Sequence, residues 1–237
     1  MRFIIRILLK ITGELFNYEN IFKNKSVVSE FLNYFFLNIK ILHEKNYEIC
    51  VVLGGGNLVR GRDNLKINRT IFDNLGILNS IINSIYFKYY LNFFKLSSLI
   101  CNSFNIEKKF FFFPSSLINN YLKNGKIIIF SGGLGIPYFS TDTTAAYRGI
   151  ELSVDYIIKL TKVDGVFNKD PNVNSDAKVY SFIRYLDIIS NNIKILDKTY
   201  LSLCLENNKK TFITNINKIE NVLLFLENKK SLGTLIF

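Results

Sequence analysis

Histidine, cysteine, proline and tryptophan are scarce or missing in this sequence, and two of these shortages exclude whole classes of site. The chain has one histidine, His43, so a zinc cluster or a Ser-His-Asp triad would have to include that residue. Its three cysteines, Cys50, Cys101 and Cys204, have no C-x-x-C spacing, which argues for a reducing compartment and against a disulfide framework. We expect them to be buried as small apolar side chains.

Long apolar runs and Pro/Gly/Ser-rich linkers are also missing. The longest apolar stretch, residues 77–100, contains Lys88, Lys95 and several asparagines, which make it too polar to span a membrane. Two basic residues interrupt the apolar N-terminal segment before it reaches the length of a signal peptide. We therefore predict a cytoplasmic protein in which residues 1–237 form a single domain.

The balance of charge is strongly basic, with 30 lysine and arginine residues, 19 acidic residues and a formal net charge of +11. Such a balance suits a polyanion, a nucleotide or an acidic membrane surface. The lysines are scattered, however, and form no basic helix face with interleaved aromatic residues. Nucleic acid is therefore an unlikely partner, although it stays open as a minor alternative.

One stretch combines a predicted strand, a glycine loop and a predicted helix start. The apolar run 127–130 (IIIF) leads into three glycines within four residues, then into a hydroxyl-rich segment that contains Asp142. A helix is expected to start near Ala145. Peptide N–H groups at a glycine turn and at a helix N-terminus can bind an anion without a cationic side chain. The glycines alone are more typical of an ordinary tight turn, so the rest of the chain must decide.

Other predicted strands end in charged residues and glycines. Such strands are expected over residues 6–13, 47–53 and 154–160. Lys10 lies at the end of the first, three consecutive glycines and Arg60 follow the second, and Lys162 follows the third. Parallel α/β sheets bind ligands at the carboxyl ends of their strands. A lysine at such a position is equally compatible with a surface role.

The remaining segments complete an alternation of strands and helices. Helices are predicted over residues 26–45, 71–94, 115–124, 184–191, 198–207 and 218–226, and further strands over 96–101, 177–182, 210–214 and 233–237. We expect Phe110 to Phe113 to be buried, at a subunit interface, because an exposed run of four phenylalanines would favour aggregation. The alternation predicts a mostly parallel sheet covered by helices on both faces.

Six ordered blocks, spread over nearly the whole chain, resemble the amino-acid kinase superfamily and, within it, the bacterial uridylate (UMP) kinases. The blocks are RILLKITGE, VVLGGGNLVRG, NRTIFDNLG, SGGLGIPYFSTDTTAAYRGIEL, LTKVDGVFNKDP and GTLI. The resemblance implies a three-layer α/β/α sandwich with a mainly parallel eight-stranded sheet, assembled as a homohexamer. It also implies transfer of the γ-phosphoryl group of ATP to UMP, giving UDP and ADP in pyrimidine nucleotide biosynthesis, with Mg²⁺ delivered by ATP.

The resemblance further implies roles for individual residues. Lys10, Asp142, Lys162 and Arg60 would be catalytic: the two lysines would neutralise the transferring phosphoryl group, Asp142 would lie between them and hold them in place, and Arg60 would grip the phosphate of UMP. UMP would also contact Gly55, Asp73, Leu134, Gly135, Ile136, Pro137, Tyr138, Phe139, Ser140 and Thr141. ATP would contact Lys10, Ile11, Thr12, Gly13, Gly56, Arg60, Thr161, Phe167 and Asp170. Asp164 and Asp197 also match acidic positions of the family, without a separate role, and no residue is expected to form a dedicated metal site.

Two departures from the family pattern bear on regulation and affinity. Leu134 and Ile136 stand where relatives usually carry polar residues, so UMP affinity is expected to be reduced. Residues 15–25 lack the glycine-bearing stretch found near the family's GTP effector site, which makes activation by GTP doubtful.

Two other functions stay open. A nucleotide- or RNA-binding protein could keep the fold without turnover, but it would not need both lysines and an acid that orders them. A related kinase could act on a carboxylate or carbamate, but the blocks around Arg60, Asp73 and Arg148 resemble the uridylate-type sequence instead.

Overall fold

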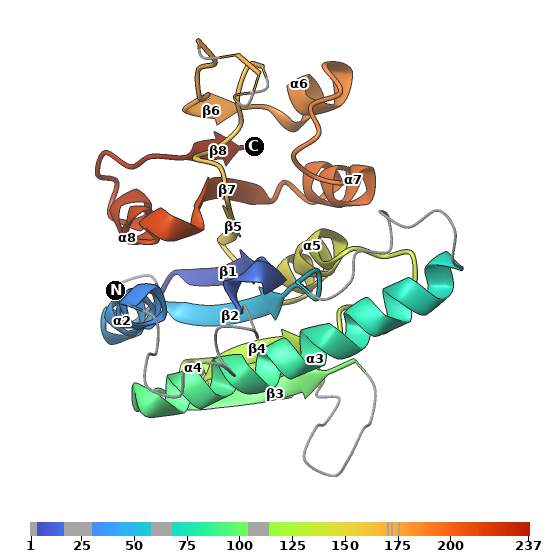
Figure 1. The fold of residues 1–237 in the computed structure, drawn as a ribbon. Coiled ribbons are helices and arrows are strands. Elements are labelled where there is room, and N and C mark those ends of the chain that lie inside the picture. Colours follow the sequence, from blue (N-terminus) through green and yellow to red (C-terminus); the bar gives the residue numbers. More distant parts are fainter. Residues whose placement is uncertain are drawn as a thin grey trace.

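A computed structural model describes residues 4–16, 30–57, 68–103, 114–169, 171, 173–174 and 176–237. Eight strands in these segments form one sheet in the order β3-β4-β2-β1-β5-β7-β8-β6 (Figure 1). They are β1 (Arg6–Ile11), β2 (Glu48–Leu53), β3 (Ser98–Asn102), β4 (Ile127–Ser131), β5 (Tyr156–Thr161), β6 (Phe182–Ile183), β7 (Lys210–Asn215) and β8 (Thr234–Ile236). Neighbouring strands are parallel except for β7 and β8, which confirms the mainly parallel sheet.

Helices cover both faces of this sheet, as the alternation of elements predicts. They are α2 (Glu30–Glu44), α3 (Arg69–Phe93), α4 (Ser115–Lys123), α5 (Thr141–Glu151), α6 (Tyr185–Ser190), α7 (Lys198–Glu206) and α8 (Glu220–Leu226), with 3₁₀ turns η1 (Gly13–Leu15) and η2 (Ile216–Lys218). One core cluster packs α2, α3 and α8 against the sheet, and a second packs α4, α5, α6 and α7 against the opposite face. The result is the expected three-layer α/β/α sandwich.

The apolar strands are buried on both faces, which explains their unbroken hydrophobic runs. In β1, Ile7 and Leu9 belong to the first cluster and Leu8 to the second, because successive side chains of a strand point to opposite faces. The predicted burial of the three cysteines is confirmed. In the part of the chain that the structure describes, no helix is both long and apolar enough to cross a membrane.

Two predicted boundaries are wrong, one at the start of a helix and one at the edge of the sheet. Helix α5 begins at Thr141 rather than near Ala145, because the Ser140 side chain accepts a hydrogen bond from the Thr143 amide at 3.0 Å and caps the helix there. The predicted strand 177–182 is reduced to β6, at the edge of the sheet, and an isolated bridge between Phe167 and Val179. The phenylalanine run 110–113 and the expected start of the helix at 26–29 lie outside the described residues.

The topology gathers the sequence motifs at one edge. Strands β4, β2, β1 and β5 are consecutive neighbours and run parallel, so their carboxyl ends lie side by side (Figure 1). The glycine loops after β2 and β4, the Lys-x-Thr-Gly end of β1 and the lysine after β5 all leave from this edge. A candidate site is therefore expected there.

Candidate active site

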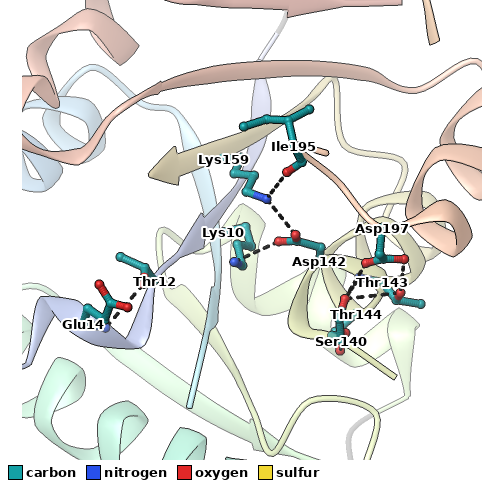
Figure 2. A network of polar contacts seen from close by, with 10 residues as sticks. All are labelled: Lys10, Thr12, Glu14, Ser140, Asp142, Thr143, Thr144, Lys159, Ile195 and Asp197. Atoms are coloured by element: carbon teal, nitrogen blue, oxygen red, sulfur yellow. Dashed lines mark hydrogen bonds and ion pairs between the residues drawn. The ribbon is translucent and has the colours of Figure 1, made fainter. Parts of the chain in front are cut away.

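Two lysines on neighbouring strands define the centre of the site. Lys10 on β1 and Lys159 on β5 are register partners in the parallel ladder, so their side chains point to the same face of the sheet. This is the face covered by α5. Lys159 is buried, and its ammonium group also donates to the Ile195 carbonyl at 2.7 Å. Figure 2 shows both ammonium groups directed toward the start of α5.

Asp142, in the first turn of α5, lies between these two lysines. One carboxylate oxygen is 2.8 Å from Lys10 Nζ and the other is 2.7 Å from Lys159 Nζ (Figure 2). The position at a helix N-terminus favours a negative charge, because the peptide dipoles leave partial positive charge there. Asp142 therefore joins α5 to the centre of the sheet through two ion pairs and fixes the positions of both ammonium groups.

The charges in this triad perturb one another. Burial alone would raise the pKa of Asp142, but the ammonium groups of Lys10 and Lys159 outweigh it and hold the pKa well below its ordinary value. Burial lowers the pKa of Lys159, as does the neighbouring Lys10, while Asp142 opposes both effects. The triad carries two positive charges and one negative charge, and is suited to attracting an anion to the strand ends.

The prediction that Asp142 lies between Lys10 and Lys162 is wrong in its second lysine. Lys162 follows the last residue of β5, its side chain is 73% exposed, and it pairs with Glu14 of η1. Lys159 takes the expected place because its strand position puts it directly opposite Lys10. A sequence pattern could have identified Lys159, because Lys10-Ile-Thr and Lys159-Leu-Thr repeat the same order of residues at the ends of the two strands.

Asp197 has a structural role next to the triad. It caps α7 by accepting a hydrogen bond from the Tyr200 amide at 2.9 Å. Its carboxylate also accepts hydrogen bonds from the hydroxyl groups of Ser140, at 2.5 Å, and Thr143, at 2.9 Å. The first turn of α5, which carries Asp142, is thereby fixed to the first turn of α7 (Figure 2).

The loops after β1 and β2 pack backbone against backbone. A Cβ atom on Gly13 would lie 2.4 Å from the Gly54 carbonyl oxygen, and one on Gly55 would lie 1.9 Å from the Gly76 carbonyl oxygen in α3. Both positions therefore require glycine. Glycine loops at strand ends are the kind of backbone that can approach a phosphate closely.

The loop after β4 is held to α3 by the predicted ribose ligand. Asp73 accepts a hydrogen bond from the Tyr138 amide at 2.9 Å, and the Arg69 guanidinium lies 4.6 Å from the centre of the Tyr138 ring. Tyr138 has φ of +73°, a left-handed conformation that a residue with a Cβ adopts at a cost. The segment from Leu134 to Thr141, predicted to surround UMP, thus lies beside the start of α3 with Ile136, Tyr138 and Phe139 exposed.

Some of the other predicted nucleotide contacts lie in the described part of the chain, and two lie outside it. Thr12 caps η1, Thr161 ends β5, and Phe167 pairs with Val179 near the same edge. Asp164 binds Lys218 at 3.0 Å, which fixes the loop after β5 to η2. The predicted residues Arg60 and Asp170 lie outside the described part of the chain.

Protein ligands for a metal are not gathered at this edge in the described residues, where no group of three or more His, Cys, Asp or Glu side chains meets. Both oxygens of Asp142 are engaged by ammonium groups. The described residues therefore do not fit a metal ion held by protein ligands alone.

Comparison with known proteins agrees with this arrangement. The family model described as "Amino acid kinase family" matches residues 6–215, and the chain belongs to that family. Within it, the chain is similar to uridylate kinases: it is 35% identical over 235 residues to the one from Campylobacter curvus, with 98% of each chain covered, and 35% identical over 238 residues to the one from Buchnera aphidicola, with 98% and 95% covered. A crystal structure of the UMP kinase from Ureaplasma parvum superposes with a TM-score of 0.86 and 30% identity, covering 100% of this chain and 99% of the other. The resemblance inferred from the six sequence blocks is confirmed.

Proposed function

We propose that this protein transfers the γ-phosphoryl group of ATP to UMP, yielding ADP and UDP for pyrimidine nucleotide biosynthesis. The observation that carries the proposal is the Lys10–Asp142–Lys159 triad at the strand ends, next to glycine loops suited to phosphates. The full-length similarity to uridylate kinases supports UMP as the acceptor. Phosphoryl transfer depends mainly on positioning and charge neutralisation, which is what this arrangement offers.

The described residues suggest a division of roles among the charged groups. Lys10 approaches the transferring phosphoryl group and is held in place by Asp142 at 2.8 Å. Lys159 is a positioning residue, because its buried ammonium group fixes the second oxygen of Asp142. Lys162, exposed and paired with Glu14, can exchange that partner for a nucleotide phosphate. Arg60 completes the catalytic set on the side of UMP.

The nucleotides are proposed to occupy the two halves of the strand edge. UMP lies between Gly55, Asp73 and the loop from Leu134 to Thr141. Its ribose replaces the Tyr138 amide as the hydrogen-bond partner of the Asp73 carboxylate. ATP lies along the ends of β1 and β5. Its contacts are the residues from Lys10 to Gly13 together with Gly56, Arg60, Thr161, Phe167 and Asp170.

Mg²⁺ is proposed to arrive with ATP and to be held by the nucleotide's phosphates rather than by a protein cage. When bound, Mg²⁺ would neutralise part of the negative charge of the phosphates. We also propose that residues 1–237 act as one domain in the cytoplasm, in keeping with one continuous sheet and three buried thiols.

Self-association is proposed from an exposed apolar stripe on α3. Seven side chains between 40% and 63% exposed follow one another at spacings of three and four residues: Ile71, Leu75, Leu78, Ile82, Ile85, Tyr89 and Phe93. An apolar stripe with this spacing can pack against a similar stripe on another helix. A second copy of α3, related by a twofold axis, presents the same uncharged stripe. We propose that this α3 stripe forms the dimer contact from which a homohexamer is built.

An acceptor panel tests the proposed function. Release of ADP from Mg-ATP is measured with UMP, CMP, dUMP, acetylglutamate and carbamate in turn. We expect release with UMP to exceed that with every other acceptor. Release with acetylglutamate or carbamate, or no release with any acceptor from a folded protein that binds nucleotide, would contradict the proposal.

A further inference from the structure

The buried face of α3 changes from apolar to polar where the helix crosses the glycine loop after β2. Toward the C-terminal end this face carries Phe87 and Leu91, which are fully buried in the core. Closer to the N-terminus the buried residues are Asn79, Ser80 and Asn83, each 1% exposed or less. Burying polar side chains costs free energy unless each finds a hydrogen-bond partner, so their contacts indicate what they do.

These three side chains bind three successive carbonyl groups. Ser80 Oγ donates to the Leu53 carbonyl at 3.0 Å, at the last residue of β2. Asn83 Nδ2 donates to the Gly54 carbonyl at 2.7 Å. Asn79 Nδ2 donates to the Gly55 carbonyl at 2.7 Å. One helix face therefore turns the three carbonyl groups in the same direction, toward α3.

The peptide N–H groups must then point the other way. In a trans peptide the carbonyl of one residue and the N–H of the next lie on opposite sides. The first N–H of the series obeys this geometry, since Gly54 donates to the Ile11 carbonyl on β1 at 2.9 Å. By the same rule the N–H groups of Gly55 and Gly56 are directed away from α3. Successive N–H groups on one side of a loop form an anion-binding concavity.

The same side chains tie this loop to its neighbours. Asn57 Oδ1 accepts hydrogen bonds from Asn79 at 2.6 Å and from Asn83 at 3.0 Å, and Asn57 Nδ2 donates to the Phe16 carbonyl at 2.9 Å. Ser80 Oγ also accepts from the Gly132 amide, in the loop after β4, at 3.2 Å. The network therefore joins the loops after β1, β2 and β4.

We propose that Asn79, Ser80 and Asn83 are positioning residues for phosphate binding: they turn the carbonyl groups of residues 53–55 inward and so present the glycine N–H groups to the phosphate. This inference deepens the proposed function and rests on it. It assigns to the middle of α3 a part in phosphate recognition, although none of the three side chains touches the nucleotide.

Comparing UMP with uridine, which lacks the phosphate, tests this assignment. In Asn79→Leu, a substitution of similar size without a donor, we expect UMP binding to weaken by about tenfold to a hundredfold, as for other small misplacements of binding groups. The dissociation constant for uridine should stay within about threefold of that of the unaltered protein, because the N–H groups of the loop bind the phosphate and uridine has none. Calorimetric titration measures both dissociation constants.

Two further variants keep the test decisive. Ser84→Ala removes a buried hydroxyl that, among the described residues, donates along the helix to the Ser80 carbonyl at 2.8 Å. This variant should leave the dissociation constants for UMP and uridine unchanged. Asn79→Ser keeps a donor in a smaller side chain and guards against a leucine variant that fails to fold; its UMP affinity should lie between those of the leucine variant and the unaltered protein.

Three results would overturn the assignment. If folded Asn79 variants bind UMP and uridine more weakly by the same factor, the network stabilises the fold in general and has no specific role in phosphate binding. Unchanged UMP binding would remove its role altogether. Failure of the unaltered protein to bind UMP would instead overturn the proposed function on which the inference rests.

Discussion

Replacing Asp142 by asparagine removes the carboxylate between two buried ammonium groups. Lys10 and Lys159, with side chains 13% and 11% exposed, would then both face a neutral amide. Removing one partner from a buried ion pair costs about 3–5 kcal/mol, because the remaining charge stays desolvated. We expect the free energy of unfolding to fall by about this amount, and the melting temperature by roughly 10 °C.

The loss should depend on pH in a defined way. Because the folded-state pKa of Asp142 is held below its ordinary value, this carboxylate stabilises the folded protein above about pH 4, and the contribution is lost as the pH falls further. The difference in free energy of unfolding between the unaltered protein and Asp142→Asn should therefore become smaller below about pH 4. It should also narrow at alkaline pH, because the folded-state pKa of Lys159 is lowered and its deprotonation relieves the uncompensated charge.

Denaturant unfolding of three proteins measures these effects: the unaltered chain, Asp142→Asn, and Asp142→Asn combined with Lys159→Met. The double variant should regain at least half of the lost free energy, since it no longer buries the second ammonium group. Turnover should stay low in both variants, because Lys10 loses its positioning partner in each. A double variant no more stable than the single one, or normal turnover in either, would refute this account of the triad.

Three further outcomes follow from the site and the α3 stripe. Lys162→Ala should lower turnover by about 10²- to 10³-fold at an unchanged melting temperature, because it removes a charge that meets the developing phosphoryl charge; near-normal turnover would exclude Lys162 from the mechanism. Asp73→Asn should raise the KM for UMP more than the KM for ATP in steady-state kinetics, and equal changes would contradict its assignment to the acceptor. Leu78→Lys should lower the mass measured by sedimentation, whereas Leu232→Lys, at a position of similar exposure away from the stripe, should not; an unchanged mass for the first would place the contact elsewhere.

Much of the fold follows from local sequence patterns. Apolar runs such as 127–130, ended by glycines, predict buried strands correctly because a strand covered on both faces needs apolar residues throughout. Sequence patterns place the start of α5 too far along the chain, because threonine and aspartate are poor helix formers. The cap at Ser140 and the bonds from Asp197 overcome that preference. The segment 177–182 has strand-like residues, but at the sheet edge only Phe182 and Ile183 find a continuous partner.

The sequence predicts individual residues of the site, but it does not predict which lysine pairs with Asp142 beside Lys10. Lys10 and Asp142 stand out as charged residues at a strand end and a helix start. Which lysine completes the triad depends on the register between β1 and β5, and that register is a tertiary property. The polar face of α3 also escaped the sequence analysis, since Asn79, Ser80 and Asn83 have meaning only opposite the loop that they bind.

Following a labelled phosphoryl group tests directly whether this protein transfers it from ATP to UMP. The purified protein is incubated with UMP and Mg-ATP labelled in the γ-phosphate, and the label is followed through the products. We expect the label to appear in UDP, one equivalent for each ADP formed. Label found only in inorganic phosphate, or retained in ATP by a folded protein that binds both nucleotides, would contradict it.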